Sequence, residues 1–339
     1  MSLATVFPKA WSEQAWWLYL LFPLSLLYFI SIKTRRYAYH MGWFKSYRAP
    51  LPVMIIGNIT VGGSGKTPLI IELVDFLQKA CHLKVGVISR GYGGKGPFPS
   101  LVNAQSTADA VGDEPVLIVQ QTGVAMAVGA DRKAAIELLL GNYELDLILS
   151  DDGLQHLALQ RDLEWIVLDI DRGLGNGFLL PAGFLREPES RLNTATVIEH
   201  GQHSQSNLNM HLRSGALYAL AAQPDVIRKP PKAGDKVHAV AGIGVPARFF
   251  ASLRALGFKV IEHPFADHHG YVPQDLDFAD QLPVITTAKD AVKMGDIACL
   301  MPEKAIWILP VNAQLSIDCY ALLHQQLSTL GLALPPFNT

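Results

Sequence analysis

A glycine-rich segment followed by lysine and threonine carries the strongest chemical signal in the chain. Residues 60–67 read TVGGSGKT, after an apolar run that begins at Val53 and before residues 69–77, whose apolar side chains recur at helical spacing. Glycines let the backbone turn so that its N–H groups point inward, and a helix that begins near Lys66 directs its positive end to the same point. This order of strand, loop and helix predicts a phosphate-binding loop.

Each part of this loop has an expected role. The backbone N–H groups would hold phosphate oxygens, Lys66 would add a positive charge, and the Thr67 hydroxyl would bind Mg²⁺. The usual consensus has glycine where Thr60 stands, so the match is incomplete, and an ordinary strand–turn–helix corner is the alternative. The residues expected to hold a nucleotide are Thr60, Val61, Gly62, Gly63, Ser64, Gly65, Lys66 and Thr67.

Two adjacent carboxylates follow a second apolar run. Asp151 and Asp152 come after residues 145–149 and are followed by glycine. Phosphate-loop enzymes place an aspartate at the end of such a strand on the Mg²⁺ side of the site. We therefore predict a magnesium site made by Thr67, Asp151 and Asp152.

Other polar residues follow predicted strands or lie in loops near their ends. Ser89 and Arg90 come at the end of the strand predicted over 85–89, where ligands bind in open α/β sheets. Residues 171–192 predict a folded-over loop or hairpin beside the site, with an irregular surface loop as the alternative. The arginines of this loop that could bind phosphates are Arg172, Arg186 and Arg191.

Three further groups have both a chemical and an ordinary interpretation. Asp113 precedes a predicted helix and could simply cap it. His268 and His269 are adjacent in a predicted loop, but no cysteine or third histidine at metal spacing accompanies them, so zinc is not expected. Residues 286–290 read TTAKD, which is similar to a turn that reads the nucleotide base in some phosphate-loop proteins; helix capping is the alternative.

The composition limits the class of protein. The chain has 339 residues, of which 50% are hydrophobic and 17% charged, with a net charge of −2. The absence of a basic excess argues against a nucleic-acid-binding protein. Three widely separated cysteines provide neither a disulfide framework nor a zinc motif.

The predicted elements alternate between strands and helices, which indicates an α/β fold. We expect a membrane anchor over residues 1–36, a phosphate-loop domain with a mainly parallel sheet over 37–213, and a smaller α/β domain over 214–339. Residues 216–220 are predicted to be a connecting strand.

The anchor is predicted from seventeen uncharged residues, 16–32, with aromatic residues near both ends. Most nearby cations follow this segment, which places the rest of the chain in the cytoplasm by the positive-inside rule. A buried helix of a soluble protein is the alternative. The sequence leaves open whether the segment crosses the bilayer or lies in one leaflet.

Seven motifs occur in an order that resembles the tetraacyldisaccharide 4′-kinase family, the lipid A 4′-kinases of Gram-negative bacteria. The motifs are GNITVGGSGKTP, SRGYG, GDEP, DDGLQH, LPAGFLREP, FADHH and TTAKD. The resemblance covers nearly the whole chain and implies two α/β domains that close on ATP. It also implies that Asp113 and a histidine of the FADHH motif activate a hydroxyl group; His268 is the expected histidine, and the adjacent His269 is the alternative.

The implied reaction uses ATP and Mg²⁺ and transfers the γ-phosphoryl group to the 4′-hydroxyl of tetraacyldisaccharide 1-phosphate, which gives lipid IVA for lipopolysaccharide. Lys66 would act in catalysis with Asp113 and His268. Residues expected near the lipid substrate are Ser89, Arg90, Gln155, Arg172, Arg186 and His269.

The implied partners are the lipid A disaccharide precursor and the membrane surface, with no nucleic acid and no obligate protein partner. The implied location is the bacterial inner membrane, with the catalytic domains on the cytoplasmic side. The alternative function is a membrane-tethered nucleotide switch or ATPase that acts on a protein partner.

Overall fold

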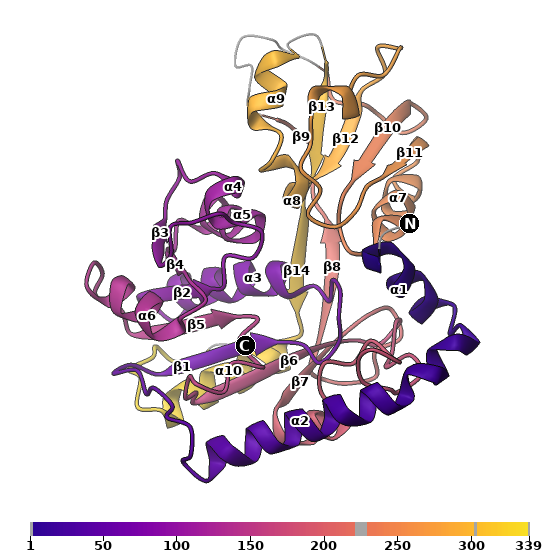
Figure 1. Cartoon of the computed structure of the whole chain (residues 1–339). Helices are drawn as coiled ribbons and strands as arrows, with labels where there is room; N and C mark the ends of the chain where they lie inside the picture. Colours follow the sequence, from indigo (N-terminus) through magenta and orange to yellow (C-terminus); the bar gives the residue numbers. More distant parts are fainter. Residues whose placement is uncertain (1–2, 221–228, 302–303, 338–339) are drawn as a thin grey trace.

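The computed structural model describes residues 3–220, 229–301 and 304–337, and it contains two sheets flanked by helices (Figure 1). The larger sheet has nine strands in the order β14-β8-β7-β6-β1-β5-β2-β4-β3, and the smaller has five in the order β11-β10-β12-β13-β9. The predicted α/β class with a mainly parallel large sheet is confirmed.

The large sheet is parallel except at β3 and β14, which pair antiparallel with β4 and β8. Its strands are β1 Val53–Gly57, β2 Val85–Ser89, β3 Ser100–Val102, β4 Ala125–Val128, β5 Leu147–Asp151, β6 Leu163–Asp169, β7 Thr196–His200, β8 Asn209–Ser214 and β14 Val311–Leu315. Strand β1 lies between β5 and β6, and all of its residues are buried. Helices cover both faces, which explains the continuous apolar runs in the sequence.

The helices around this sheet are α3 Lys66–Lys79, α4 Ala108–Val111, α5 Asp113–Thr122, α6 Arg132–Leu140 and α10 Ile317–Thr329. Alternate residues of β1 serve the two faces, since Met54 packs in a core with Leu73 of α3, whereas Ile55 packs with Ile136 of α6. This alternation follows from the two-residue repeat of a strand. It fixes the end of β1, and therefore the phosphate loop, between two well-packed layers.

The small sheet contains β9 Tyr218–Ala219, β10 Lys236–Ala241, β11 Lys259–Pro264, β12 Val284–Thr287 and β13 Ile306–Leu309. Its helices are α7 Pro246–Ala255, α8 Ala288–Ala291 and α9 Gly295–Leu300, with the 3₁₀ turn η3 at Pro273–Asp275. Figure 1 shows this unit above the large sheet, joined to it through β8 and β14.

The connecting strand was predicted in the wrong place. Residues 218–219 form the antiparallel edge strand beside β13, while β8 and β14 run between the two units. The apolar run over residues 305–311 divides at Pro310 between β13 and β14, which belong to different sheets. Proline cannot donate a ladder hydrogen bond, so it ends the pairing in one sheet.

Residues 311–337 differ from the predicted grouping of 214–339. Strand β14 joins the large sheet, and α10 packs through Cys319, Leu323 and Leu327 into the same core as α3. Burial of this apolar face explains why the end of the chain returns to the first unit.

The N-terminal segment forms α1 Leu3–Ser12, the 3₁₀ helix η1 Trp16–Leu21 and α2 Phe22–His40, so the helix runs past the predicted boundary at 36. Residues 16–40 are long and apolar enough to cross a membrane, and 11% of the apolar window is buried. Figure 1 shows α2 lying along the bottom of the large-sheet unit. The loop or hairpin predicted over residues 171–192 is an irregular loop up to residue 188, and its last residues belong to the 3₁₀ helix η2 Glu189–Thr194.

Candidate active site

The glycine-rich segment has the backbone shape that phosphate binding requires. It joins the end of β1 to the start of α3, and φ is +98° at Gly62 and +83° at Gly65. These values lie in the left-handed region that favours glycine. Helix α3 begins at Lys66, as predicted, so its first N–H groups face this loop.

Thr60 occupies the position of the missing consensus glycine without strain. It forms an antiparallel bridge with Leu185, and its hydroxyl accepts a hydrogen bond from Asn58 Nδ2 at 3.2 Å. The chain is therefore extended and paired at this point, which suits a β-branched residue.

Lys66 points toward the predicted metal side of the site. Its Nζ lies 3.1 Å from Asn58 Oδ1 and 3.5 Å from Asp152 Oδ1. Arg186 Nη1 binds both oxygens of Asp152, at 2.9 and 3.1 Å. Burial would raise the pKa of Asp152, but Lys66 and Arg186 together lower it below its ordinary value.

Asp151 has the opposite electrostatic setting. Its Oδ2 accepts from the Ser89 hydroxyl at 3.2 Å, while the buried Oδ1 has no hydrogen-bond partner among the described residues. Burial, followed by the charges of Glu114 and Asp152, raises the pKa of Asp151 to about 7. A nearby cation would stabilise the ionised form of the Asp151 carboxyl and so lower this pKa.

The donor set therefore fits Mg²⁺. An unsatisfied buried carboxylate oxygen on Asp151 lies at the end of β5, beside the phosphate loop strand β1. Within the described ranges no three His, Cys, Asp or Glu side chains form a metal cluster. Mg²⁺ commonly takes only one or two carboxylates and completes its shell with phosphate and water, so the finding agrees with a site shared with a nucleotide.

Two charged residues near Asp151 were missed by the sequence analysis. Arg132 is 3% exposed and donates to the backbone oxygens of Gly129 and Asp151. Glu114 acts on Asp151 through its charge and pairs with Lys289 at 3.0 Å. Both stand in first helical turns, where a charged residue is normally solvated, so only the fold reveals their position.

The structure brings Asp113 and His268 together from different units. Nδ1 of His268 lies 2.9 Å from Asp113 Oδ2 and 3.1 Å from Oδ1, and the Glu114 N–H donates to Oδ1 at 2.9 Å. Asp113 is the first residue of α5, while Gly112 precedes it as the N-cap, so the carboxylate binds the histidine as well as a helix N–H.

The electrostatics of this pair follow from its contacts. Burial would raise the pKa of Asp113, but the hydrogen bond to His268 and the charges of Lys289 and Lys293 lower it. The same hydrogen bond raises the pKa of His268 against the effect of burial. The arrangement thus favours a carboxylate that stays ionised beside an imidazole that holds a proton more firmly.

His269 points elsewhere. Its Nε2 lies 2.9 Å from Asp275 Oδ2 and its ring stacks on Phe265. These contacts remain within the small unit. Of the two adjacent histidines, only His268 reaches Asp113.

The TTAKD turn has the capping arrangement. Thr287 accepts from the Asp290 N–H at 3.0 Å, and the fully buried Asp290 accepts from the Gly242 N–H at 3.0 Å. Lys289 pairs with Glu114 across the two units. The side chains of Lys289 and Asp290 already have protein partners, which favours helix capping over the base-reading interpretation.

The arginines predicted to bind phosphates are largely paired with protein groups. Arg172 donates to the Val61 carbonyl and stacks on Phe184, and Arg186 binds Asp152. Arg191 is buried between Glu164 and Glu187, so its expected role as a free phosphate ligand was wrong.

Gln155 also connects residues of this region. Its amide nitrogen donates to Glu187 at 3.0 Å and to the Asn58 carbonyl at 3.3 Å. Arg90, by contrast, is exposed at the end of β2 and has no hydrogen-bond or ion-pair partner in the described part of the chain.

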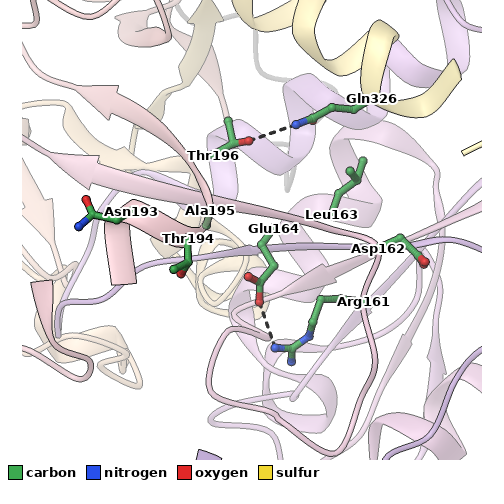
Figure 2. Close-up of a pocket in the computed structure, with 9 residues that line it drawn as sticks. All are labelled: Arg161, Asp162, Leu163, Glu164, Asn193, Thr194, Ala195, Thr196 and Gln326. Atoms are coloured by element: carbon green, nitrogen blue, oxygen red, sulfur yellow. Dashed lines mark hydrogen bonds and ion pairs between the residues drawn. The ribbon is translucent and has the colours of Figure 1, made fainter. Parts of the chain in front are cut away.

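A separate cavity of about 560 Å³ lies near the starts of β6 and β7 (Figure 2). Its lining residues are Arg161, Asp162, Leu163, Glu164, Asn193, Thr194, Ala195, Thr196 and Gln326. None of the predicted site residues is among them. The phosphate loop lies at the carboxyl ends of the parallel strands, where ligands bind in such sheets.

Comparisons with known proteins agree with the motif order. A family model described as tetraacyldisaccharide-1-P 4′-kinase matches residues 17–328. The tetraacyldisaccharide 4′-kinase of Psychrobacter arcticus is 48% identical over 98% of this chain and 97% of its own, and that of Actinobacillus pleuropneumoniae is 46% identical over 95% and 99%.

A solved structure is similar as well. The crystal structure of LpxK from Aquifex aeolicus in complex with ATP has a TM-score of 0.72 and 26% identity, covering 92% of this chain and 99% of that one. With the family model over nearly the whole length and relatives near half identity, the chain belongs to the tetraacyldisaccharide 4′-kinase family.

Proposed function

We propose that this chain transfers the γ-phosphoryl group of ATP to the 4′-hydroxyl of tetraacyldisaccharide 1-phosphate and so forms lipid IVA. The observation that carries the proposal is the contact of Asp113 with His268, which joins two units of a chain that also has a phosphate loop. A nucleotide switch needs no pair that activates a hydroxyl group. The kinase is therefore favoured over the switch.

Residues 60–67 would hold the triphosphate through backbone N–H groups, with Lys66 adding positive charge. Asp151 and Thr67, with Asp152 nearby, would hold Mg²⁺. When bound, Mg²⁺ would neutralise charge on the transferred phosphoryl group. Lys66 lies 3.5 Å from Asp152 in this structure and would turn toward the phosphates when a nucleotide is present.

The Asp113–His268 pair would accept the proton of the attacking hydroxyl. A positioned acid–base group of this kind typically contributes about 10²- to 10⁴-fold in rate. Because the two residues come from different units, docking of the units assembles the pair. This arrangement would limit hydrolysis of ATP when no lipid is bound.

The lipid would lie beside Ser89 and Arg90 at the end of β2. Arg90 is exposed and has no hydrogen-bond or ion-pair partner among the described residues, which suits contact with a phosphate. Arg172, Arg186 and Gln155 hold the loops around the nucleotide and would act on the substrate through them.

We also propose that α2 lies in one leaflet on the cytoplasmic side of the inner membrane. One face of the helix packs on the protein through Ser25, Tyr28 and Ile32, so these residues cannot face lipid. The other face exposes Leu24 and Leu27. A single buried face and a single apolar exposed face are the pattern of an interfacial helix.

Transfer of label from ATP tests the reaction. Full-length protein in detergent would receive Mg²⁺ and ATP labelled at the γ-phosphate, with or without tetraacyldisaccharide 1-phosphate. We expect label in a bisphosphorylated lipid and none with a Lys66→Ala variant. Hydrolysis of ATP that is independent of lipid, without labelled lipid, would instead support the switch.

A further inference from the structure

The loop after β6 lies between the N-terminal helices and the phosphate loop. We call residues 178–187 the bridge segment. Its apolar residues Leu179, Phe184 and Leu185 are buried in one small cluster. Tyr28 and Ile32 of α2 contact this cluster from one side, and Val61 of the phosphate loop contacts it from the other.

Helix α2 binds the bridge segment through specific hydrogen bonds. Ser25 is 4% exposed; its hydroxyl donates to the Leu179 carbonyl at 2.8 Å and accepts from the Ala182 N–H at 3.0 Å. The Tyr28 hydroxyl donates to the Arg186 carbonyl at 3.1 Å. A helix that served only as a membrane tether would not need two polar side chains, one of them buried, directed at one loop.

The opposite side of the bridge segment binds the phosphate loop. The Phe184 carbonyl accepts from the Val61 N–H at 2.8 Å, and the Arg186 N–H donates to the Ile59 carbonyl at 2.7 Å. The Arg186 side chain continues to Asp152, which faces Lys66. The backbone of Arg186 thus binds on both sides: its carbonyl accepts from the Tyr28 hydroxyl, and its N–H donates to the strand that leads into the phosphate loop.

We propose that α2 is a structural part of the nucleotide site, and that Ser25 and Tyr28 are positioning residues for the phosphate loop. They act through the bridge segment, which holds Ile59, Thr60 and Val61 in the extended path that leads into Gly62. A phosphate loop binds its ligand through backbone N–H groups, so a small displacement of its entry strand weakens several contacts at once.

Because α2 also carries the exposed apolar face, the same helix would couple contact with a membrane to the shape of the site. This inference goes beyond the proposed reaction. It rests on the proposed placement of ATP at residues 60–67, and the coupling to a membrane rests in addition on the proposed position of α2.

The test measures ATP affinity in membrane-free detergent solution with full-length protein. The variants are Tyr28→Phe and Ser25→Ala, with binding of a fluorescent ATP analogue and Mg²⁺ followed by titration. We expect about fivefold weaker binding for Tyr28→Phe, the change that loss of a hydrogen bond worth about 1 kcal/mol gives. The KM for ATP would rise in parallel, while the KM for lipid would stay constant.

Tyr320→Phe is the matched control. It also removes one tyrosine hydroxyl bond between elements, to Glu72 at 2.6 Å, but it does not touch the bridge segment. Melting temperatures of all three variants would be recorded. Tyr28→Phe keeps the ring in its apolar cluster, so it decides the question if Ser25→Ala fails to fold.

The outcomes separate the alternatives. Weaker ATP binding in the Tyr28 and Ser25 variants but not in the control supports the proposal. An ATP affinity of the Tyr28 and Ser25 variants within twofold of that of the unchanged protein refutes it. A loss of ATP affinity in all three variants that follows the fall in melting temperature refutes it as well. Lys66→Ala serves as a further arm, because unchanged ATP binding in that variant would mean that residues 60–67 are not the nucleotide site.

Discussion

The ion pair between Arg248 and Asp169 should control the docking of the two units. Arg248 of α7 binds both oxygens of Asp169 at the end of β6, at 2.5 and 3.0 Å. Near this pair, Gly244 approaches the backbone of Gly63 so closely that a Cβ on Gly244 would lie 2.9 Å from its nitrogen. Replacing Arg248 with methionine keeps the aliphatic length and removes the pair.

The magnitude follows from burial. The Asp169 side chain is 4% exposed and that of Arg248 is 43% exposed. Arg248→Met would therefore leave the Asp169 carboxylate buried without its partner. In the unchanged protein, however, solvent reaches the arginine and weakens the ion pair. A hydrogen bond to a charged group contributes about 1.5–3 kcal/mol, and we assign this range to the whole pair because of the solvent on the arginine. The docked arrangement would become about 10- to 100-fold less favourable.

The assay is steady-state transfer of phosphate to the lipid acceptor. We expect kcat/KM to fall about 10- to 100-fold for Arg248→Met, because docking also brings His268 to Asp113. Arg248→Lys keeps the charge but loses the bidentate contact, so its kcat/KM should lie between those of the unchanged protein and Arg248→Met. In the double variant with Asp169→Asn the second change should add little. A kcat/KM within twofold of the unchanged protein for Arg248→Met would refute the reasoning.

Three further predictions concern the site itself. Asp151→Asn should lower turnover at least about 10²-fold, because a bound metal ion stabilises the transition state by several kcal/mol. It should also raise the Mg²⁺ concentration needed for half-maximal activity; an unchanged Mg²⁺ titration would exclude this carboxylate as a ligand. His268→Ala should lower kcat about 10²- to 10⁴-fold with little change in ATP affinity, whereas His269→Ala should affect mainly stability; equal losses of kcat would contradict the choice between them. Because the hydrogen bond to Asp113 raises the pKa of His268 above 6.5, the stability from this pair is fully present below that value and is lost as pH rises through the raised pKa. The melting temperature of His268→Gln should therefore lie further below that of the unchanged protein at about pH 6 than at about pH 9, and a difference that grew with pH would show the sign to be wrong.

Local patterns determined much of the fold. The phosphate loop was predictable because its parts depend on neighbours in sequence. These parts are the apolar run at β1, the glycines at 62 and 65, and the start of α3. The strand before Asp151 was predictable for the same reason. Motif order also indicated the family, although residue spacing alone did not distinguish His268 from His269.

Tertiary contacts decided the rest. Arg132 and Glu114 look like ordinary surface charges of first helical turns, and only the fold buries Arg132 and places Glu114 near Asp151. Arg191 looked like a free cation in a loop, but it is enclosed by Glu187, four residues before it, and by Glu164 of β6, which only the fold brings close. Charge and burial depend on what packs against a side chain, which the local pattern does not contain.

The sequence by itself determined the phosphate loop, the alternating α/β class and the apolar N-terminal helix, because each arises from residues within a few turns of one another. The tertiary structure alone decided which histidine meets Asp113, which strands join the two units, and that α2 packs on the segment that holds the phosphate loop. These outcomes depend on contacts between residues as far apart as Asp113 and His268, where the geometry of the whole fold sets the distance.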